Sequence, residues 1–224
     1  MSLAFQRARR PEQMAARRAA ILEVARAMLS EKSVTDISLR ELSDRVGLAK
    51  SNVLRYFDSR EAIFLEVLLA ECESWLVRLE AGLGRPRARK SGYANEIRVA
   101  TAIADTLADA PLLCELVGAM AGVLERNISV DSARDFKARV VDGIAMLAGV
   151  IARQLPWLPP ETLALYAEGV VMLAAGMYPF SNPTDPVRAA IAELDMPDPR
   201  QRFVDGLREA LINWLIGAAV RSED

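Results

Sequence analysis

Residues 38–64 read SLRELSDRVGLAKSNVLRYFDSREAIF, and the spacing within this stretch decides the fold of the N-terminal part of the chain. Ser38 stands at a helix-capping position with Glu41 three residues later, which is the pattern of a capping box. Apolar residues follow at helical spacing until Gly47, a residue type that commonly ends helices in the left-handed conformation. A second helix is expected over about residues 49–56. The pattern predicts two short helices joined by a tight turn, which is a helix-turn-helix.

The second of these helices has one apolar face and one polar face. Val53 and Phe57 are four residues apart and therefore turn the same face inward. The outer face is basic and carries small hydrogen-bonding groups, which suits contact with base edges and phosphates in the major groove of DNA. The alternative is a plain helical hairpin whose polar face is only solvated. The outward residues are Lys50, Ser51, Asn52 and Arg55.

The flanking sequence favours the DNA-binding interpretation. Upstream, residues 17–31 repeat apolar side chains at helical spacing, so a first helix is expected to pack over the hairpin. Downstream, Asp58 and Glu61 form a second capping box that begins the next helix. Ahead of the first helix lies a basic arm, which either reaches the DNA or is a disordered N-terminus. The cations in this region are Arg7, Arg9, Arg10, Arg17 and Arg18.

The block at residues 19–64 resembles the N-terminal domain of the TetR family of transcriptional regulators. The resemblance covers the first third of the chain. It implies a homodimer that binds a double-stranded DNA operator. It further implies a second domain in each subunit that binds a small molecule and so controls DNA binding. The resemblance is carried by LREL at 39–42, VGL at 46–48, KSNVLRYF at 50–57 and SREAIF at 59–64.

The same resemblance implies residue roles in DNA binding. Lys50 and Ser51 stand at positions that read bases, and Asn52 and Tyr56 stand at positions that hold phosphates. Arg40, on the preceding helix, is expected to approach a base or a phosphate. These roles come from the family pattern and not from the spacing of the residues.

Two positions differ from the family pattern. Arg60 replaces a lysine that meets the DNA backbone at the start of the fourth helix, and a guanidinium can do this with more donors. Leu54 replaces a tyrosine that donates to a phosphate, so either one backbone contact is lost or the leucine meets a thymine methyl. The full set of expected DNA-binding residues is Arg40, Lys50, Ser51, Asn52, Leu54, Arg55, Tyr56 and Arg60.

Charge is divided unevenly along the chain. Residues 1–60 hold 12 Lys and Arg against 7 Asp and Glu, whereas the remaining 164 residues hold 16 against 23, and the net charge is −2. An acidic whole chain would argue against DNA binding, but the asymmetry between the parts is the informative quantity. We therefore expect residues 1–58 to be the helix-turn-helix DNA-binding domain with its basic arm. Residues 59–224 are expected to be a helical ligand-binding and dimerisation domain.

The remainder of the chain is expected to be entirely helical, because alternating β-branched segments are missing. Hydrophobic residues make up 52% of the chain, which indicates extensive buried or interface surface. The predicted fold is all-α, with an N-terminal three-helix DNA-binding domain followed by a larger helical domain. Glycines inside the expected helices indicate close helix packing or, alternatively, room for a ligand. Further helices are expected over residues 59–83, 92–108, 111–127, 131–155, 161–178, 187–194 and 200–220.

Two of these helices carry apolar stripes that predict a dimer interface. One domain core cannot easily cover both stripes, and obligate dimers bury such surfaces. We expect a four-helix interface formed by these two helices from each subunit. The alternative is that Trp214 is an ordinary core tryptophan. The stripes are Leu163, Val170, Leu173, Ala174 and Met177 on one helix, and Phe203, Leu207, Leu211, Trp214, Leu215 and Ala218 on the other.

A ligand pocket is expected inside the C-terminal domain, at a location that the family resemblance implies. Large apolar side chains on the expected helices favour an apolar or aromatic small molecule over a sugar or nucleotide. Each of these residues has core packing as its alternative role. Arg98, Glu115 or Arg139 is a candidate for one orienting charge. The expected lining is Trp75, Leu79, Met120, Leu124, Phe136, Val140 and Met146.

Catalytic and metal-binding signals are weak. The chain has no histidine, and it lacks a phosphate-cradling glycine loop or a nucleophile elbow. Cys72 and Cys114 stand alone, which indicates inert thiols. The apolar run at residues 169–180 is too short to span a bilayer as a helix, and no signal segment follows the N-terminal arginines. We expect a cytoplasmic protein with no enzyme activity, no cofactor, no metal and no membrane contact.

The sequence therefore predicts a ligand-responsive DNA-binding transcriptional regulator. A repressor that a small apolar effector of unknown identity releases from its operator is the preferred form. The alternatives are a transcriptional activator, and an all-α enzyme or carrier protein for an apolar small molecule.

Overall fold

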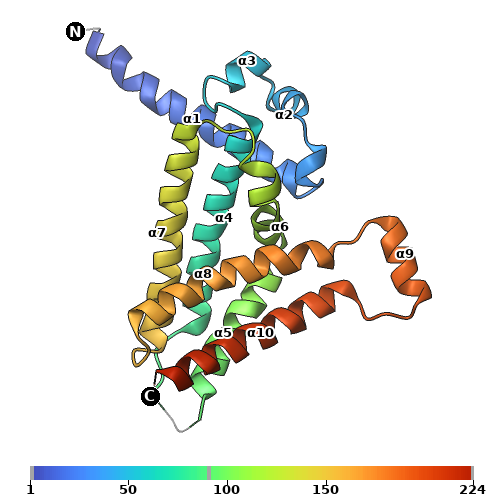
Figure 1. Ribbon diagram of the computed structural model, residues 1–224. Helices are drawn as coiled ribbons and strands as arrows, with labels where there is room; N and C mark the ends of the chain where they lie inside the picture. The colour runs from blue at the N-terminus through green and yellow to red at the C-terminus, as the bar shows by residue number, and fades with distance from the viewer. Residues whose placement is uncertain (1–2, 90–91, 223–224) are drawn as a thin grey trace. The chain divides into compact units, whose positions relative to one another are not determined.

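The computed structural model describes residues 3–89 and 92–222, with the side chains of residues 3–10 outside the description (Figure 1). Helices and turns account for all the regular structure in these ranges, and no strand occurs among them. The all-α prediction is confirmed. By compactness the chain divides into two units, residues 1–70 with 119–137 and residues 71–118 with 138–224. The predicted functional division after residue 58 stays a prediction, since compactness assigns no function.

The first unit contains a helix-turn-helix. Helix α1 (Leu3–Leu29) lies against α2 (Leu39–Val46), and α2 lies against α3 (Lys50–Val53). A short 3₁₀ turn, η1 (Val34–Asp36), links α1 to α2, and the first part of α4 (Arg60–Leu83) follows α3. The core joins all of these helices because their apolar faces are buried together: Ile21, Ala25, Met28, Ile37, Leu42, Val53, Phe57, Ile63 and Phe64.

The ends of α2 form as the sequence predicts. The Ser38 hydroxyl accepts a 3.1 Å hydrogen bond from the backbone N–H of Glu41, which satisfies one free donor of the first turn. At the other end, Gly47 has φ of 74°, in the left-handed region that glycine adopts without a Cβ clash. Its N–H donates back to the Asp44 carbonyl at 3.2 Å. This cap turns the chain sharply toward α3.

Helix α3 is shorter than predicted. The expected helix over 49–56 is α-helical only for Lys50–Val53. After that point the backbone bonds tighten, with Arg55 N–H donating to the Asn52 carbonyl and Tyr56 N–H donating to the Val53 carbonyl. These hydrogen bonds join residues three apart, as in the 3₁₀ turns that often end an α-helix. The polar residues 50–56 therefore lie on one α-turn followed by one tighter turn.

The cap of α4 also differs from the prediction. Ser59, and not Asp58, accepts the first-turn hydrogen bond, from the backbone N–H of Ala62 at 3.0 Å. The helix begins at Arg60, so Ser59 occupies the capping position and Asp58 lies one residue too early. The carboxylate of Asp58 is consequently available for a different contact, described below.

The remaining part of the first unit is the segment between α6 (Pro111–Ala119) and the start of α7 (Val130–Gln154). It contains one π-helical turn, η2 (Met120–Leu124). Lys137 on α7 pairs with Glu125 at 2.6 Å, which closes this segment on itself.

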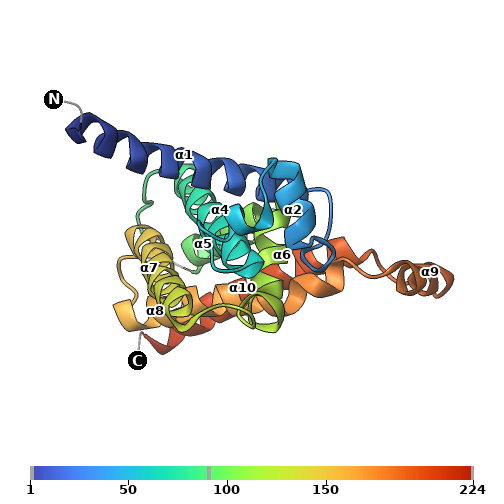
Figure 2. The same ribbon diagram turned by 90° about the horizontal axis from the view of Figure 1, so that it is seen from above.

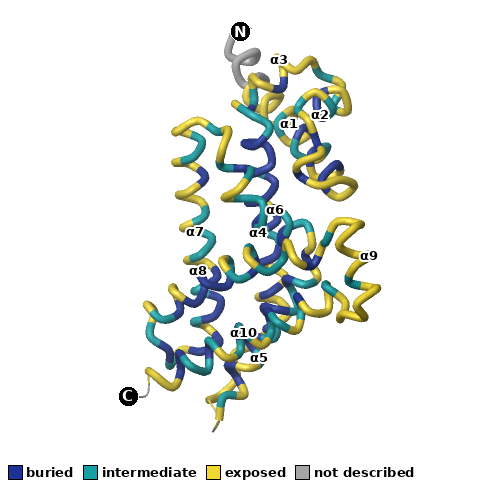
Figure 3. The backbone as a smooth tube through the Cα atoms, turned by 45° about the vertical axis from the view of Figure 1, so that its right-hand side comes forward, coloured by how far each residue is buried: buried dark blue, intermediate teal, exposed yellow. Residues whose placement is uncertain are grey.

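The second unit contains α5 (Ala94–Ala108), α6, α8 (Pro160–Met177), η3 (Tyr178–Ser181), α9 (Asp185–Glu193) and α10 (Pro199–Arg221). Helix α10 packs against both α5 and α8 (Figure 2). Helix α9 stands apart from α8 and α10, beyond the end of α8 and the start of α10. No α9 residue is buried, and Figure 3 shows its exposure along its length.

One helix with its following turn, Pro160–Ser181, has the length and hydropathy of a possible membrane span, and the bent pair Ala94–Ala108 and Pro111–Leu124 passes the same test when joined. The sequence analysis counted only the uninterrupted apolar run at 169–180, and it therefore underestimated the length of the apolar segment Pro160–Ser181. A core helix passes this test as well, and Leu163, Tyr166 and Val170 on α8 are buried within the unit. Packing within the unit thus accounts for part of the apolar character of α8, since a third of the apolar window is buried.

Candidate nucleic-acid interface and sensor region

The helix-turn-helix presents most of the predicted DNA-binding side chains to solvent. Seven of the eight predicted residues come together on α2, on α3 and on the tight turn that follows α3. Tyr56 is half-buried, and Leu54 keeps 40% of its surface exposed, so its side chain is accessible to a partner. The others on this surface are exposed: Arg40, Lys50, Ser51, Asn52 and Arg55.

The two cations of the α3 region have no carboxylate partner among the described residues. Lys50 and Arg55 are exposed, and neither forms an ion pair there. The cations of α2 are differently placed, since Arg45 holds Glu31 bidentately and Arg40 lies 3.9 Å from Asp44. The α3 surface therefore carries uncompensated positive charge, which is the electrostatic requirement for a phosphate contact.

Arg45 has a structural role in this arrangement. The hydrogen bonds between Arg45 and Glu31 lower the pKa of the Glu31 carboxyl group and raise the pKa of Arg45. The pair joins the end of α1 to α2, and Lys32 makes a parallel contact with Glu41. Both pairs are solvent-exposed, so they orient α2 more than they stabilise the fold.

Arg60 is occupied inside the unit. Its guanidinium donates to the Ile37 carbonyl at 2.6 Å and to Glu61 Oε1 at 2.7 Å, and it lies 5.6 Å from the centre of the Phe64 ring. Only 20% of the side chain is exposed. The predicted phosphate contact of Arg60 stays a prediction, and the structure gives the residue a second role in fixing α4 to the loop before α2.

Arg18, which the sequence analysis grouped with the cations of the basic N-terminal region, has a structural role that the sequence analysis did not identify. It donates to the backbone carbonyl of Tyr56 at 2.7 Å and to Glu66 at 2.7 Å, and its guanidinium stacks 4.1 Å from the centre of the Phe57 ring. It thus fixes the turn after α3 to α1 and α4. The sequence offers no signal for this role, because the partners lie 38 and 48 residues away.

The first unit also contains a contact between the end of the helix-turn-helix and the start of α7. Asp58 accepts hydrogen bonds from the hydroxyl of Ser132, at 2.8 and 3.0 Å, and from the backbone N–H of Ser129 at 3.4 Å. The hydrogen bonds from Ser129 and Ser132 lower the pKa of Asp58 despite partial burial. The reading motif is therefore tied to α7 as well as to α4.

Comparison with known proteins identifies the family. Residues 21–67 match the family described as "Bacterial regulatory proteins, tetR family", and residues 69–222 match "Tetracyclin repressor-like, C-terminal domain". The two matches meet inside α4 and together cover most of the chain. The chain belongs to the TetR family. It is accordingly a DNA-binding transcriptional regulator and not an enzyme.

Individual relatives agree with this assignment. The HTH-type transcriptional regulator RutR of Escherichia coli K12 is 32% identical over 73 residues, which are 33% of this chain and 34% of RutR. The match thus spans about a third of the curated relative. A TetR regulator from Rhodococcus sp. RHA1 has a TM-score of 0.54 at 16% identity, with 90% of this chain and 98% of that one covered.

A second solved structure, FadR from Bacillus subtilis in complex with stearoyl-CoA, has a TM-score of 0.52 at 10% identity, with 87% of this chain and 97% of that one covered. Identities this low show the fold alone. The confirmed expectations are therefore the TetR family, the all-α fold and the class of DNA-binding regulator.

The predicted ligand-binding residues of this TetR-family chain do not fall in one compact unit. Trp75, Leu79, Val140 and Met146 belong to the second unit, whereas Met120, Leu124 and Phe136 belong to the first. Met146 is 49% exposed, but the Trp75 indole is buried and donates to the Thr106 hydroxyl at 3.0 Å. The set stays a prediction. None of its members lines the cavity described further below.

The three candidates for an orienting charge have partners within the chain. Arg98 donates to Gln154 Oε1 at 2.7 Å, while Gln154 donates to the Gly84 carbonyl, and burial lowers the pKa of Arg98. Arg139 forms an ion pair with Glu73 at 3.2 Å. Glu115 is not without a partner in the chain either. No choice among the three follows from these contacts.

Most of the predicted dimer-interface residues are buried inside a single subunit. Leu173, Met177 and Trp214 are half-buried. The other eight turn toward α5 and toward each other, because one helical face of α10 packs on α5 and α8. The predicted interface stays a prediction, and the faces of α8 and α10 opposite to these buried residues are a second candidate surface for a dimer. The eight buried residues are Leu163, Val170, Ala174, Phe203, Leu207, Leu211, Leu215 and Ala218.

The two cysteines and the described acidic groups give no sign of redox or metal chemistry. Cys114 is buried and Cys72 half-buried, and burial raises the pKa of each thiol to about 12. Thiols with such pKa values are poor nucleophiles and poor metal ligands at neutral pH. Within residues 3–89 and 92–222, no cluster of acidic or sulfur side chains could hold a metal ion.

Proposed function

We propose that this TetR-family protein is a cytoplasmic homodimeric repressor that a small apolar effector releases from a double-stranded DNA operator. The observation that supports DNA binding most directly is the exposed α3 surface, where Lys50 and Arg55 lack carboxylate partners. Each subunit would place α3 in one major groove. Two such helices need a separation of about 34 Å to meet successive grooves on one side of the duplex.

The effector would act by preferring one conformer of the dimer. A ligand shifts an equilibrium only by its difference in affinity for the two states. The apolar character of the effector rests on residue type, since Trp75, Leu79 and Phe136 are large apolar side chains that are buried. The acyl ligand named for the Bacillus subtilis FadR neighbour is in keeping with an apolar effector.

Fluorescence anisotropy with labelled duplexes tests DNA binding. The duplexes tile the region upstream of the protein's own gene, and unlabelled calf thymus DNA serves as competitor. We expect one duplex to bind more tightly than its neighbours by about a thousandfold, the lower range for specific recognition. Equal affinity for all duplexes in the tiled region would contradict the proposed operator. An activator is the second candidate, and a promoter–reporter fusion with and without the regulator gene decides the sign of regulation.

A further inference from the structure

The segment between α8 and α10 forms an arm, defined here as residues 178–198. It consists of η3, α9 and the link to α10. The arm exposes large apolar side chains, with Phe180 exposed to 81%, Leu194 to 71% and Val187 to 51%. Isolated exposed apolar residues are common, but a group on one short segment indicates a binding surface.

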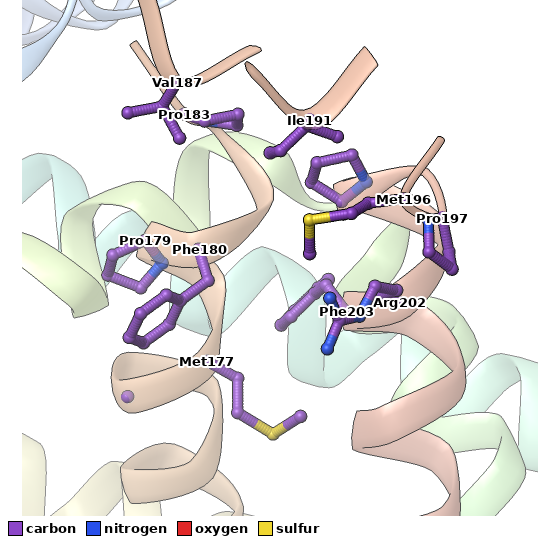
Figure 4. A pocket seen from close by; sticks show the side chains of 12 residues that line it. Met177, Pro179, Phe180, Pro183, Val187, Ile191, Met196, Pro197, Arg202 and Phe203 are labelled. Atoms are coloured by element: carbon purple, nitrogen blue, oxygen red, sulfur yellow. The ribbon is translucent and has the colours of Figure 1, made fainter. Parts of the chain in front are cut away.

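A cavity of about 470 Å³ lies between the arm and the facing ends of α8 and α10. Figure 4 shows Val187 and Ile191 of α9 on one side, Met177 and Phe203 on the other, and Met196 reaching toward the middle. All lining residues belong to the second unit. The volume is in the range of small-molecule sites, and the two methionines can adapt to a flexible chain.

One cation lines this otherwise apolar cavity. The side chain of Arg202, on the first turns of α10, extends into it (Figure 4). Arg202 forms no ion pair or hydrogen bond with another side chain in the described part of the protein. A guanidinium at an apolar wall without a counter-ion is matched best by a carboxylate, which it can bind through two parallel hydrogen bonds.

The two acidic residues closest to Arg202 in sequence, Asp198 and Asp205, have other partners. Asp198 caps α10 by accepting from the backbone N–H of Gln201 at 2.8 Å. Asp205 accepts from the Gln201 side chain at 2.9 Å and pairs with Arg208 at 3.2 Å. Arg202 is therefore left as the charge that an external anion would meet.

From these contacts we propose that the arm cavity binds an amphipathic monocarboxylate, with its alkyl chain among the apolar side chains and its carboxylate on Arg202. The site is separate from the predicted effector residues, and its occupancy does not depend on the proposed repressor function. Apolar side chains of another copy of the chain are the competing occupant that the experiment below distinguishes. The unmatched cation favours the carboxylate.

Isothermal titration calorimetry on the full-length protein tests the proposal, with decanoate as the probe and decan-1-ol as the matched neutral chain. Decanoate is kept below its critical micelle concentration and decan-1-ol below its solubility limit. We expect one decanoate per chain. Arg202→Gln should weaken decanoate binding at least tenfold and leave decanol binding unchanged. Arg200→Gln, which removes a nearby charge outside the lining, is the control and should have a much smaller effect.

Two results would overturn the assignment. The first is decanoate affinity that Arg202→Gln leaves unchanged, or no decanoate binding at all. The second is a wild type that binds no decanoate while Val187→Asp converts dimers to monomers in sedimentation velocity, since the cavity would then seat a second copy. Circular dichroism of each variant shows whether it is folded. A loss of operator binding alone would not bear on this site.

Discussion

The Ser132 hydroxyl donates a 2.8 Å hydrogen bond to Oδ2 of Asp58, and this bond joins the first turn of α7 to the last residue before the α4 cap. Ser129 adds its backbone N–H to the same carboxylate. Three groups thus meet at the boundary between the reading motif and the helical region that follows it. This boundary is therefore connected to two helices. Helix α4 follows it in the chain, and α7 is hydrogen-bonded to it through Asp58.

Removing the Asp58 contact should lower stability by a modest amount. Ser132→Ala removes one hydrogen bond to a charged acceptor, and such bonds contribute about 1.5–3 kcal/mol when shielded, less here because the site is exposed. We expect a loss of about 0.5–1 kcal/mol in urea unfolding. Ser222→Ala, which removes a hydroxyl bonded only within the end of α10, is the matched control. An unchanged midpoint for Ser132→Ala would show that the contact carries no energy.

The same contact predicts a pH dependence. Hydrogen bonds from Ser129 and Ser132 lower the pKa of Asp58 below its ordinary value of 3.8, so the folded state favours the carboxylate. The resulting stability is fully present above the ordinary value and is lost as pH falls through the lower folded pKa. Asp58→Asn should therefore be less stable than wild type at pH 7, and the difference should shrink near pH 3. A difference that is equal at both pH values would contradict an ionised Asp58.

Close packing at Gly169 allows a sharp test of the α8–α10 contact. A Cβ at this position would lie 1.9 Å from Cη2 of Trp214, whose ring meets Tyr166 edge to face at 5.7 Å. The Tyr166 ring that Trp214 meets is held inside the core, since the Tyr166 hydroxyl donates to the Leu211 carbonyl. Gly169→Ala should destabilise the protein by about 1–3 kcal/mol or more, as overpacked cores do.

Gly176→Ala is the control for this prediction. It lies on the same helix with no atom within 4 Å of the position of its Cβ. The added methyl group should instead stabilise α8 by about 0.5–1 kcal/mol, because alanine is the better helix former. Thermal unfolding of both variants gives the comparison. Equal melting temperatures would mean that α8 and α10 do not approach each other this closely.

Variants of Lys50 and Arg60 should distinguish a residue that recognises DNA from a residue that stabilises the fold. Lys50 is exposed without an ion pair, so Lys50→Ala should leave unfolding unchanged and weaken operator binding by about 1–3 kcal/mol if it reads a guanine. Arg60 donates to Ile37 and Glu61, so Arg60→Gln should cost about 1–3 kcal/mol of stability. The measurements are urea unfolding and anisotropy as a function of salt. If the operator affinity of Arg60→Gln depended less on salt concentration than that of the wild type, the predicted contact between Arg60 and a phosphate would be supported.

The sequence predicted local features well because they depend on neighbours in the chain. The Ser38 cap, the Gly47 turn and the buried face of α1 follow from spacing alone. The cap of α4 was wrong by one residue, because Asp58 and Ser59 are both good capping residues. The role of Arg18 was out of reach, since its partners are distant in sequence.

Apolar stripes were the least decisive signal. Periodicity locates the apolar side of a helix but does not say whether its own subunit or a partner covers that side. On α8 and α10 the strong stripe packs within the subunit, as Leu207 and Leu211 show with no exposed surface. The weaker opposite side, with Leu165 and Met172 exposed to 60% and 63%, could be recognised only once the core was known.

This assignment of faces gives a final prediction about the dimer. Leu165 and Met172 are seven residues apart, so they lie on one face of α8, and both are exposed in the single subunit. If this outer face forms the homodimer interface, the double variant Leu165→Asp, Met172→Asp should sediment as a monomer while keeping its helical circular dichroism. A buried pair of carboxylates at a symmetric interface would be too costly to retain.

Trp214→Asp should behave differently, because Trp214 packs on Gly169 and Tyr166 inside the subunit. The charge would enter the core, so we expect loss of the folded protein and not a folded monomer. Val77→Asp, an exposed position on α4, is the control for added surface charge and should leave the dimer intact. If the α8 double variant remained dimeric while Trp214→Asp gave folded monomers, the stripe facing α5 would be the interface after all.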